Sequence, residues 1–435
     1  MIKVAKFGGS SLSDASSFRR VKSIVEADKL KQVIVVSAPG KSSQYDNKIT
    51  DLLYLLYAHI KYGVAYQTVF DLIKERFLTI EKELGLYVGI EEKFDSLKKE
   101  LTKNISEEYL VSRGEYFNAL LMSKFLNYAF VDSIQLLKYD YDGLLNNAQT
   151  QEAFQRIFDQ VGPMVIPGFY GSYPSGSVRL LSRGGSDLTG SIAAFALGAS
   201  VYENWTDVSG ILMADPKIVK NPKQILQITY EELRELSYMG ANVLHEDSIL
   251  PLQGVDIPIN IKNTFAPDEP GTLIQAHCTD DSSIITGISG KKDFTVFTIT
   301  KSNKSKKIKV IQDVLSVFER FNVNIEHIPS SIDSFSVICE AVQVEKVFYS
   351  LISSINQIED VLRIDTEKEM ALISIVGRNM STRPGIAGRL FGLLGSKQIN
   401  INMIAQSSQE INIVVGVKND DFERTIQTIY ESFRD

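Results

Sequence analysis

An internal repeat in the last third of the chain constrains its fold more than any other feature. Val323-Asn324-Ile325 and Ile399-Asn400-Ile401 lie 76 residues apart, and the same offset relates an amphipathic helical pattern at residues 311–318 to another at residues 387–394. Helix, strand, turn and returning strand therefore occur twice. The repeat predicts two α-β-β units, and each such unit is the centre of a ferredoxin-like βαββαβ module.

Residues 1–280 instead alternate short β-rich runs with longer helical patterns, which is typical of an α/β domain. A strongly helical stretch at residues 51–112 interrupts the alternation, and we expect it to form a helical excursion from the sheet. Its aromatic residues should pack together and its charges should form a solvated face. The expected strands are residues 32–36, 132–137, 163–166, 201–205 and 257–262.

Length and composition limit the possible function. A chain of 435 residues is expected to form two or three domains, and 44% hydrophobic with 23% charged residues fits a globular protein. The net charge of -7 argues against a nucleic-acid partner. No apolar run approaches the ~18 residues of a membrane span, and no signal-type segment precedes the first strand, so we expect a cytoplasmic enzyme. Cys278 and Cys339 have neither disulfide nor zinc-site spacing.

A phosphate site is indicated near the N-terminus, where residues 4–11 read V-A-K-F-G-G-S-S. Gly8 and Gly9 can turn sharply and expose main-chain N–H groups, Ser10 adds a hydroxyl, and Lys6 supplies a positive charge. Taken alone, the pattern also fits a plain Gly-Gly turn beside a solvated lysine.

Five further motifs follow in a characteristic order. Together with the glycine turn, they resemble the aspartate kinases, a branch of the amino-acid kinase superfamily, and the resemblance runs from Lys3 almost to the C-terminus. The motifs are residues 36–38, Ser112-Arg113-Gly114-Glu115, residues 182–190, residues 205–217 and residues 263–272.

The repeat resembles the paired ACT domains of the same family, which are small regulatory amino-acid binders. One of them is inserted into the other, so the resemblance implies a kinase domain at residues 1–283, a first ACT domain at 291–365, and a second at 284–290 and 366–435. The fold class is therefore α/β. A mostly parallel sheet flanked by helices, with the helical excursion, is followed by two ferredoxin-like ACT domains.

The resemblance implies transfer of the γ-phosphoryl group of ATP to the side-chain carboxylate of L-aspartate. A carboxylate with a pKa of ~3.9 is already ionised at neutral pH, so no general base is needed. Catalysis should then consist of positioning and charge neutralisation, with Mg²⁺ as the accompanying ion. By resemblance, Lys6 bridges the phosphates and Asp187 orients that lysine and the metal; a helix N-cap is the alternative role for Asp187. The residues that match the nucleotide side are Lys6, Gly8, Gly9, Ser10, Thr206, Asp207, Leu212 and Lys217.

An α-amino acid requires a cation for its carboxylate and an anion for its ammonium group, and Arg183 and Glu115 match these family positions. An exposed residue in the first turn of a helix is the alternative reading of Glu115. Two departures from the family pattern, Leu212 in place of tyrosine and Asn242 in place of lysine, concern nucleotide affinity. The loop at residues 39–47 is also longer than the common family version. The other substrate contacts implied are Ser37, Thr50, Phe169 and Ser186.

Feedback inhibition by lysine, with threonine as the alternative effector, is implied through the first ACT copy. In the family the effector lies between subunits, so the resemblance also implies a homodimer or a homotetramer formed through the ACT domains. Lysines crowd the start of the helix near residue 307, which also fits a solvated basic helix start. The implied effector positions are Lys307, Val310, Ile311, Asn324, Ile325, Glu326, Ser331 and Asp333.

Two other functions remain open from the sequence. Another kinase of the superfamily, acting on glutamate or a nucleotide, would share the glycine turns but would not be expected to carry the repeat. An inactive kinase acting as an amino-acid sensor would lack Lys6 or Asp187, and both are present.

Gly40-Lys41-Ser42 does not complete a P-loop, because the first glycine would fall at Val35. His245 has no partner set for metal binding or nucleophilic catalysis. With no sequence after residue 435 for a fused dehydrogenase, a monofunctional chain is expected.

Overall fold

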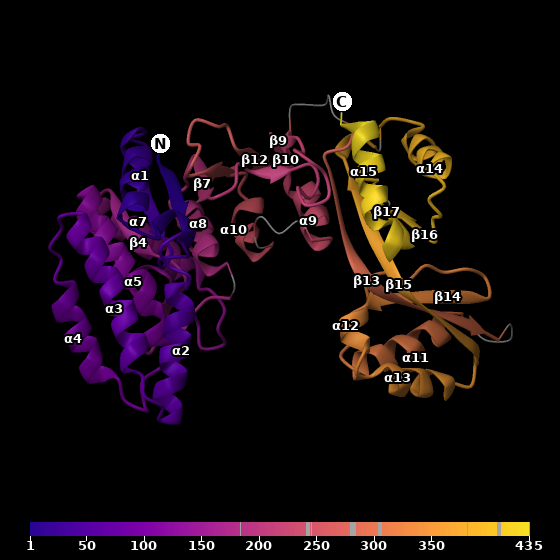
Figure 1. Cartoon of the computed structure of the whole chain (residues 1–435), viewed down its shortest axis with the longest axis horizontal. Helices are drawn as coiled ribbons and strands as arrows, with labels where there is room; N and C mark the ends of the chain where they lie inside the picture. The colour runs from indigo at the N-terminus through magenta and orange to yellow at the C-terminus, as the bar shows by residue number, and fades with distance from the viewer. Residues whose placement is uncertain are drawn as a thin grey trace. The chain divides into compact units, whose positions relative to one another are not determined.

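The computed structural model describes residues 1–182, 184–240, 244, 246–278, 284–302, 307–380, 382–406 and 410–434 (Figure 1). The chain forms two compact units. The first contains Met1–Ile211, Gln224–Tyr230 and Asn242–Cys278, and the second contains Leu212–Lys223, Glu231–Ala241 and Thr279–Asp435. Among the described helices, none is both long and apolar enough to cross a membrane.

The first unit is built on an eight-stranded sheet of order β10-β12-β11-β7-β1-β2-β4-β3. Every pair of neighbours is parallel except β11 and β12, which are antiparallel. The central strand β1 reads K-V-A-K-F and is almost completely buried, as expected for a parallel strand covered on both faces. The strands are β1 (Lys3–Phe7), β2 (Lys31–Val36), β3 (Ala129–Phe130), β4 (Met164–Pro167), β7 (Val201–Thr206), β10 (Gln227–Thr229), β11 (Ile259–Asn263) and β12 (Thr272–Gln275).

Helices pack on this sheet, and α5 and α8 contact its central strands. The short strands of the unit are β5 (Tyr170–Ser172), β6 (Val178–Leu180), β9 (Gln224–Ile225) and β8 (Ile211–Leu212), whose last residue belongs to the second unit. The helices are η1 (Gly9–Leu12), α1 (Ala15–Glu26), α2 (Ile49–Tyr62), α3 (Gln67–Glu83), α4 (Ile90–Glu100), α5 (Glu107–Leu126), α6 (Ser133–Leu136), α7 (Asn147–Val161), α8 (Gly185–Ala196), η2 (Glu246–Ser248) and α10 (Leu250–Gln253).

The predicted helical excursion is confirmed: residues 51–112 fall on α2, α3, α4 and the start of α5. Its aromatic residues form a packed cluster, in which the Phe94 and Phe117 rings stack with centroids 4.6 Å apart and Phe70 and Phe77 contact Phe94. The predicted strand at residues 132–137 is wrong. Asp132 instead caps the short helix α6, because its Oδ1 accepts a hydrogen bond from the Ile134 N–H at 3.2 Å.

The second unit contains an antiparallel five-stranded sheet of order β14-β13-β15-β17-β16. Its strands are β13 (Gly287–Lys301), β14 (Ser334–Glu340), β15 (Val361–Val376), β16 (Met403–Gln406) and β17 (Asn412–Lys418). The helices are α9 (Tyr230–Tyr238), whose first residue belongs to the first unit, α11 (Lys307–Arg320), α12 (Ala341–Val344), α13 (Phe348–Asn356), η3 (Arg378–Met380), α14 (Ile386–Ser396), η4 (Asn419–Asp421) and α15 (Phe422–Phe433).

The predicted repeat is confirmed in the second unit. Helices α11 and α14 each bury one apolar stripe, and the buried residues correspond at the predicted offset: Val310, Val314 and Phe318 in α11, and Ile386, Leu390 and Leu394 in α14. The strands β13 and β15 run through both copies, and their pairing register shifts between Lys291 and Phe294. The copies differ at one edge, where β16 is regular but its counterpart consists of the isolated bridges His327–Ile338 and Ser330–Phe335.

Candidate active site

The glycine turn follows directly from the central strand β1. The Gly8 N–H donates to the Trp205 carbonyl at 3.0 Å, and η1 begins at Gly9. The main chain of Gly40 approaches closely, because its N–H donates to the Gly9 carbonyl at 2.8 Å. A Cβ on Gly9 would lie 2.8 Å from the Ala38 carbonyl oxygen, and a Cβ on Gly40 would lie 2.5 Å from the Gly9 carbonyl carbon. Glycine is therefore required at both positions.

Lys6 points from β1 toward the start of α8. Its Nζ lies 2.5 Å from Oδ1 of Asp187, and only 9% of the Lys6 side chain is exposed. The Asn204 amide on the neighbouring strand β7 also donates to Asp187 Oδ1, at 3.0 Å. Asp187 is not the N-cap of α8, because that position is Gly184 and makes no side-chain capping bond. Asp187 instead orients Lys6, and Asn204 orients Asp187.

Glu115 is buried in the middle of α5, so it is not an exposed first-turn residue. One carboxylate oxygen, Oε1, accepts a hydrogen bond from the Ala38 N–H at 3.1 Å. The other, Oε2, is buried without a hydrogen-bond partner in the described part of the chain. Burial raises the pKa of the Glu115 carboxyl to about 8, although the Ala38 N–H and the Arg113 charge oppose the shift. A buried, half-satisfied carboxyl of this kind favours a cationic ligand group.

Phe169 has a left-handed backbone, with φ of 78°. Its N–H donates to Thr189 Oγ1 of α8 at 3.1 Å. Gly185 passes so close that a Cβ there would lie 2.7 Å from the Phe169 ring. Strained backbone in a non-glycine residue often occurs at functional sites, where surrounding structure enforces it.

Most of the predicted site residues line one cavity of about 1190 Å³ in the first unit. Those that line it are Lys6, Gly8, Gly9, Ser10, Ser37, Thr50, Glu115, Phe169, Ser186, Asp187, Thr206 and Asp207. Leu212 and Lys217 are not in this lining and belong to the second compact unit. Arg183 lies outside the described residues, as do Asn242 and His245.

The cavity also contains residues that the motifs did not indicate. Lys41 and Lys48 add two positive charges, and Asp51 and Tyr54 extend the wall along α2. Gly40-Lys41 was recognisable only as an incomplete P-loop, so its place in the cavity depends on the tertiary fold. The glycines and serine of the second turn, Ser182, Gly184 and Gly185, lie within a motif that did indicate the site.

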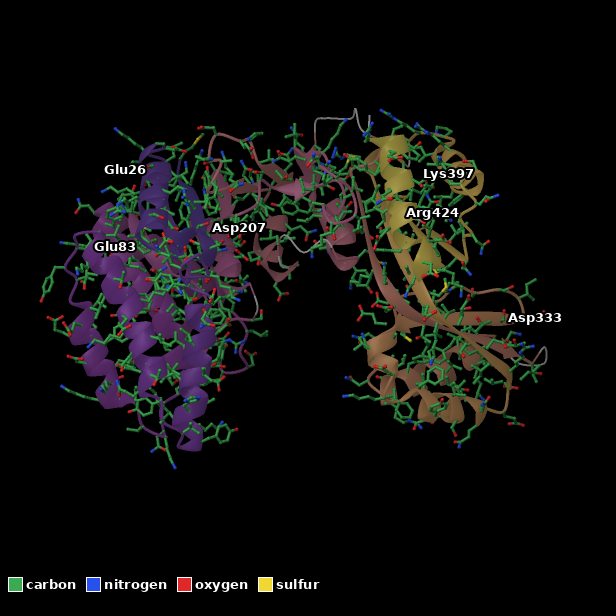
Figure 2. The ribbon with its side chains drawn as sticks, viewed as in Figure 1. Glu26, Glu83, Asp207, Asp333, Lys397 and Arg424 are labelled. Carbon is green, nitrogen blue, oxygen red and sulfur yellow. The ribbon has the colours of Figure 1, made fainter. Side chains whose placement is uncertain are left out.

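The charges of the cavity suit a zwitterion together with a polyphosphate. Lys6, Lys41 and Lys48 are cationic and Asp187 and Asp207 are anionic, whereas Glu115, whose pKa is raised to about 8, becomes anionic when a cationic group binds it. In the described residues, no three His, Cys, Asp or Glu side chains are grouped to hold a metal ion by themselves. Magnesium bound with substrate phosphates needs only one or two protein carboxylates, so Asp187 and Asp207 fit such an ion (Figure 2 labels Asp207).

The predicted effector positions lie at the start of α11 and around the turn before β14. Val310 is fully buried in the hydrophobic core of the first copy, so its side chain serves packing there. Ile311, Ile325 and Glu326 are half-buried, whereas Asn324, Ser331 and Asp333 are exposed (Figure 2 labels Asp333). Lys307 begins α11, and its side chain lies outside the described part of the structure.

Comparison with known proteins matches residues 1–263 to the amino acid kinase family and residues 373–433 to an ACT domain. Aspartokinase 3 of Bacillus subtilis (strain 168) is 34% identical over 450 aligned residues, which cover 99% of this chain and 98% of that protein.

Solved structures of aspartate kinases also resemble this chain over nearly its full length. The aspartate kinase of Clostridium acetobutylicum is 44% identical, with a TM-score of 0.95 over 99% of this chain and 100% of that chain. Escherichia coli aspartokinase III in complex with aspartate and ADP is 26% identical, with a TM-score of 0.77 over the full length of both chains. The same enzyme in complex with lysine and aspartate gives a TM-score of 0.78.

Proposed function

Since the chain belongs to the amino acid kinase family and, within it, to the aspartokinases, we propose that the cavity beside β1 is its catalytic site. The enzyme is an aspartate kinase: it phosphorylates the side-chain carboxylate of L-aspartate with ATP and yields 4-phospho-L-aspartate. This is the first step toward lysine, threonine and methionine. The site assignment is carried by one observation, that the Lys6–Asp187 pair and the half-satisfied carboxyl of Glu115 line the same cavity.

The reaction requires two anions to meet. The aspartate carboxylate attacks the γ-phosphorus, the bond to the β,γ-bridging oxygen breaks, and ADP leaves with that oxygen. Lys6 neutralises charge on the phosphates, and its ammonium group is held in place by Asp187, which Asn204 orients. The main-chain N–H groups of Gly9 and Ser10 in the cavity wall add donors for phosphate oxygens, whereas the Gly8 N–H already donates to the Trp205 carbonyl.

Magnesium is the proposed companion ion of ATP, and Asp187 and Asp207 are the carboxylates that would hold it with the phosphates. When bound, the ion supplies positive charge that neutralises the phosphates. Thr206 lines the cavity beside Asp207 and donates to its Oδ1 at 3.2 Å. Leu212 and Lys217 remain proposals for the nucleotide side.

Glu115 is proposed to bind the ammonium group of aspartate and Arg183 its α-carboxylate. The unpartnered Oε2 of Glu115 supports the first role, because an ammonium group would satisfy it. Ser37, Thr50, Phe169 and Ser186 complete the proposed substrate contacts, and all four line the cavity.

The domain limits proposed from the sequence are 1–283, 291–365, and 284–290 with 366–435. The register shift in the pairing of β13 with β15, between Lys291 and Phe294, supports a junction of the two ACT copies there. We propose lysine as the effector, with threonine as the alternative, acting between subunits of a homodimer or homotetramer. The solved complex of Escherichia coli aspartokinase III with lysine supports this choice.

An ATP-dependent hydroxamate assay, which traps acyl phosphates, tests the function when run over aspartate, glutamate and other amino acids. Of the amino acids tested with the full-length protein, only aspartate should give a strong hydroxamate signal. Glu115→Gln should raise the KM for aspartate more than the KM for ATP, because the ammonium partner is lost. Glu107→Gln, at the exposed start of the same helix, is the matched control. Equal effects on both KM values would place Glu115 elsewhere.

A further inference from the structure

Arg76 is a buried arginine in the helical excursion, close to the active-site cavity but not among the residues that line it. It lies on α3 and is only 3% exposed. Its guanidinium donates to three main-chain carbonyls: to Asn47 at 2.8 Å, to Ser13 at 3.0 Å, and to Gly40. In the described part of the chain it forms no ion pair with a carboxylate.

The three carbonyls belong to two segments that meet at the cavity. Gly40 and Asn47 lie near the two ends of the loop at residues 39–48, and Ser13 directly follows the turn η1. The Tyr45 ring, from the middle of the loop, covers the guanidinium at 4.2 Å from its centroid. Arg76 therefore holds both ends and the middle of the loop and joins the loop to the end of the glycine turn.

This loop connects the two halves of the cavity. It begins after Ala38, whose N–H holds Glu115, and Gly40 bonds to Gly9 of the phosphate turn. It ends at Lys48, just before the wall residue Thr50. Lys41 and Lys48, at its ends, line the cavity, are exposed, and make no ion pair in the described residues. Two unpaired cations at this place would attract the anionic substrates.

We propose that Arg76 is a positioning residue for phosphoryl transfer, which locks loop 39–48 against the glycine turn so that Lys41 and Lys48 face the substrates. Burying an arginine without a carboxylate partner is costly, and burial lowers the pKa of the Arg76 guanidinium. Three carbonyl acceptors for Nη1 and Nη2 and a stacked tyrosine offset part of that cost, while Nε has no hydrogen-bond partner in the described residues. These contacts match the planar, multi-donor guanidinium better than a lysine ammonium. The inference rests on the proposed catalytic role of the cavity.

The test compares Arg76→Met, Arg76→Lys and the control Arg19→Met. Arg19 is exposed on α1 and also donates to a main-chain carbonyl, that of Glu83, away from the cavity. Arg76→Met should lower kcat/KM for aspartate by about 10²-fold, the scale expected when a reacting group is misplaced by about 1 Å. Arg76→Lys should fall between the wild type and Arg76→Met, and Arg19→Met should match the wild type.

A second measurement separates positioning from general destabilisation. A lysine-specific endoproteinase should cut after Lys41 and Lys48 several-fold faster in Arg76→Met and Arg76→Lys than in Arg19→Met, as read by mass spectrometry at a temperature where all variants are folded. If Arg76→Met does not fold, Arg76→Lys decides the result. Unchanged kinetics in the Arg76 variants, or lost activity without faster cleavage of the loop, would overturn the proposal. An inactive wild-type enzyme in the hydroxamate assay would instead refute the proposed function.

Discussion

Glu232 of α9 and Arg378 of η3 form an ion pair, with Arg378 Nε 3.2 Å from Glu232 Oε2. The Glu232 side chain is only 1% exposed, and its Oε1 also accepts from the Arg378 N–H at 3.0 Å and from Thr286 Oγ1 at 2.5 Å. Glu232 lies in the region matched to the amino acid kinase family, whereas Arg378 lies in the region matched to the ACT domain. A buried carboxylate thus fastens a segment of kinase sequence to the ACT copy inside the second compact unit.

Arg378→Met should destabilise the second unit by about 3 kcal/mol, because it removes the Arg378 guanidinium from the buried Glu232 carboxylate. Denaturant unfolding of the single variants, of Glu232→Gln and of the double variant would measure the coupling energy. Arg363→Met is the control, since Arg363 pairs with Asp365 on the surface and should change stability little. Additive effects of the two single substitutions would show that the pair is not coupled.

Lys6→Ala should lower kcat by at least about 10²-fold, because a preorganised charge that faces the phosphates is lost. The fold should persist, which circular dichroism and thermal unfolding can establish. Asp187→Asn should also lower kcat, since Lys6 would lose its orienting partner. Lys29→Ala, at an exposed position, is the control. Near wild-type turnover in folded Lys6→Ala would remove Lys6 from the mechanism.

The raised pKa of Glu115 predicts that the difference in stability between the wild type and Glu115→Gln depends on pH. Its folded-state pKa is about 8 against an ordinary 4.5, so between these values the folded state binds more protons than the unfolded state. The free energy of unfolding contributed by this group therefore falls as pH rises from about 4.5 to 8. Glu115→Gln cannot ionise, so it should gain stability relative to the wild type across this window. If the free energies of unfolding of the two proteins changed with pH in parallel, the raised pKa of Glu115 would be contradicted.

Binding of aspartate should release a proton at pH 7. The ammonium group favours the ionised form of Glu115, so its pKa should fall when the substrate binds. Calorimetric titration of aspartate in two buffers of different ionisation enthalpy measures the proton count directly. Glu115→Gln should abolish the difference between the buffers, and Glu107→Gln should preserve it. An identical binding enthalpy in both buffers for the wild type would exclude this role.

Lysine at millimolar concentration should lower kinase activity and shift the sedimentation coefficient. An effector bound at a subunit interface must shift the association equilibrium, and association must change the effector affinity by the same factor. Asp333→Asn, at an exposed predicted effector position, should weaken both effects while the uninhibited rate stays unchanged. Asp365→Asn, on the exposed part of β15, is the control. If neither lysine nor threonine changed activity or assembly, the regulatory proposal would fail.

Local patterns in the sequence were sufficient to predict the elements that depend on residue periodicity and on backbone freedom. The repeat offset predicted which faces of α11 and α14 are buried, because an amphipathic helix carries its packing face in its own spacing. The glycine turn was predictable because it needs residues without a Cβ where Gly9 and Gly40 approach each other. Family motifs placed Lys6, Glu115 and Asp187, which the fold brings into one cavity.

Only the tertiary structure decided the features that depend on distant partners. Residues 132–137 have an apolar strand-like pattern, but they contain the short helix α6, where the Tyr170 hydroxyl donates to Asp132 Oδ1 at 2.8 Å and Ser133 Oγ donates to the Pro167 carbonyl. Lys41 and Lys48 are ordinary surface lysines in the sequence and become part of the cavity because of where their loop is held. Arg76 looks like one more charge on a helix, yet its partners Gly40 and Ser13 lie 36 and 63 positions away. The role of a side chain beside the cavity depends on long-range contacts, and no local pattern of residues encodes those contacts.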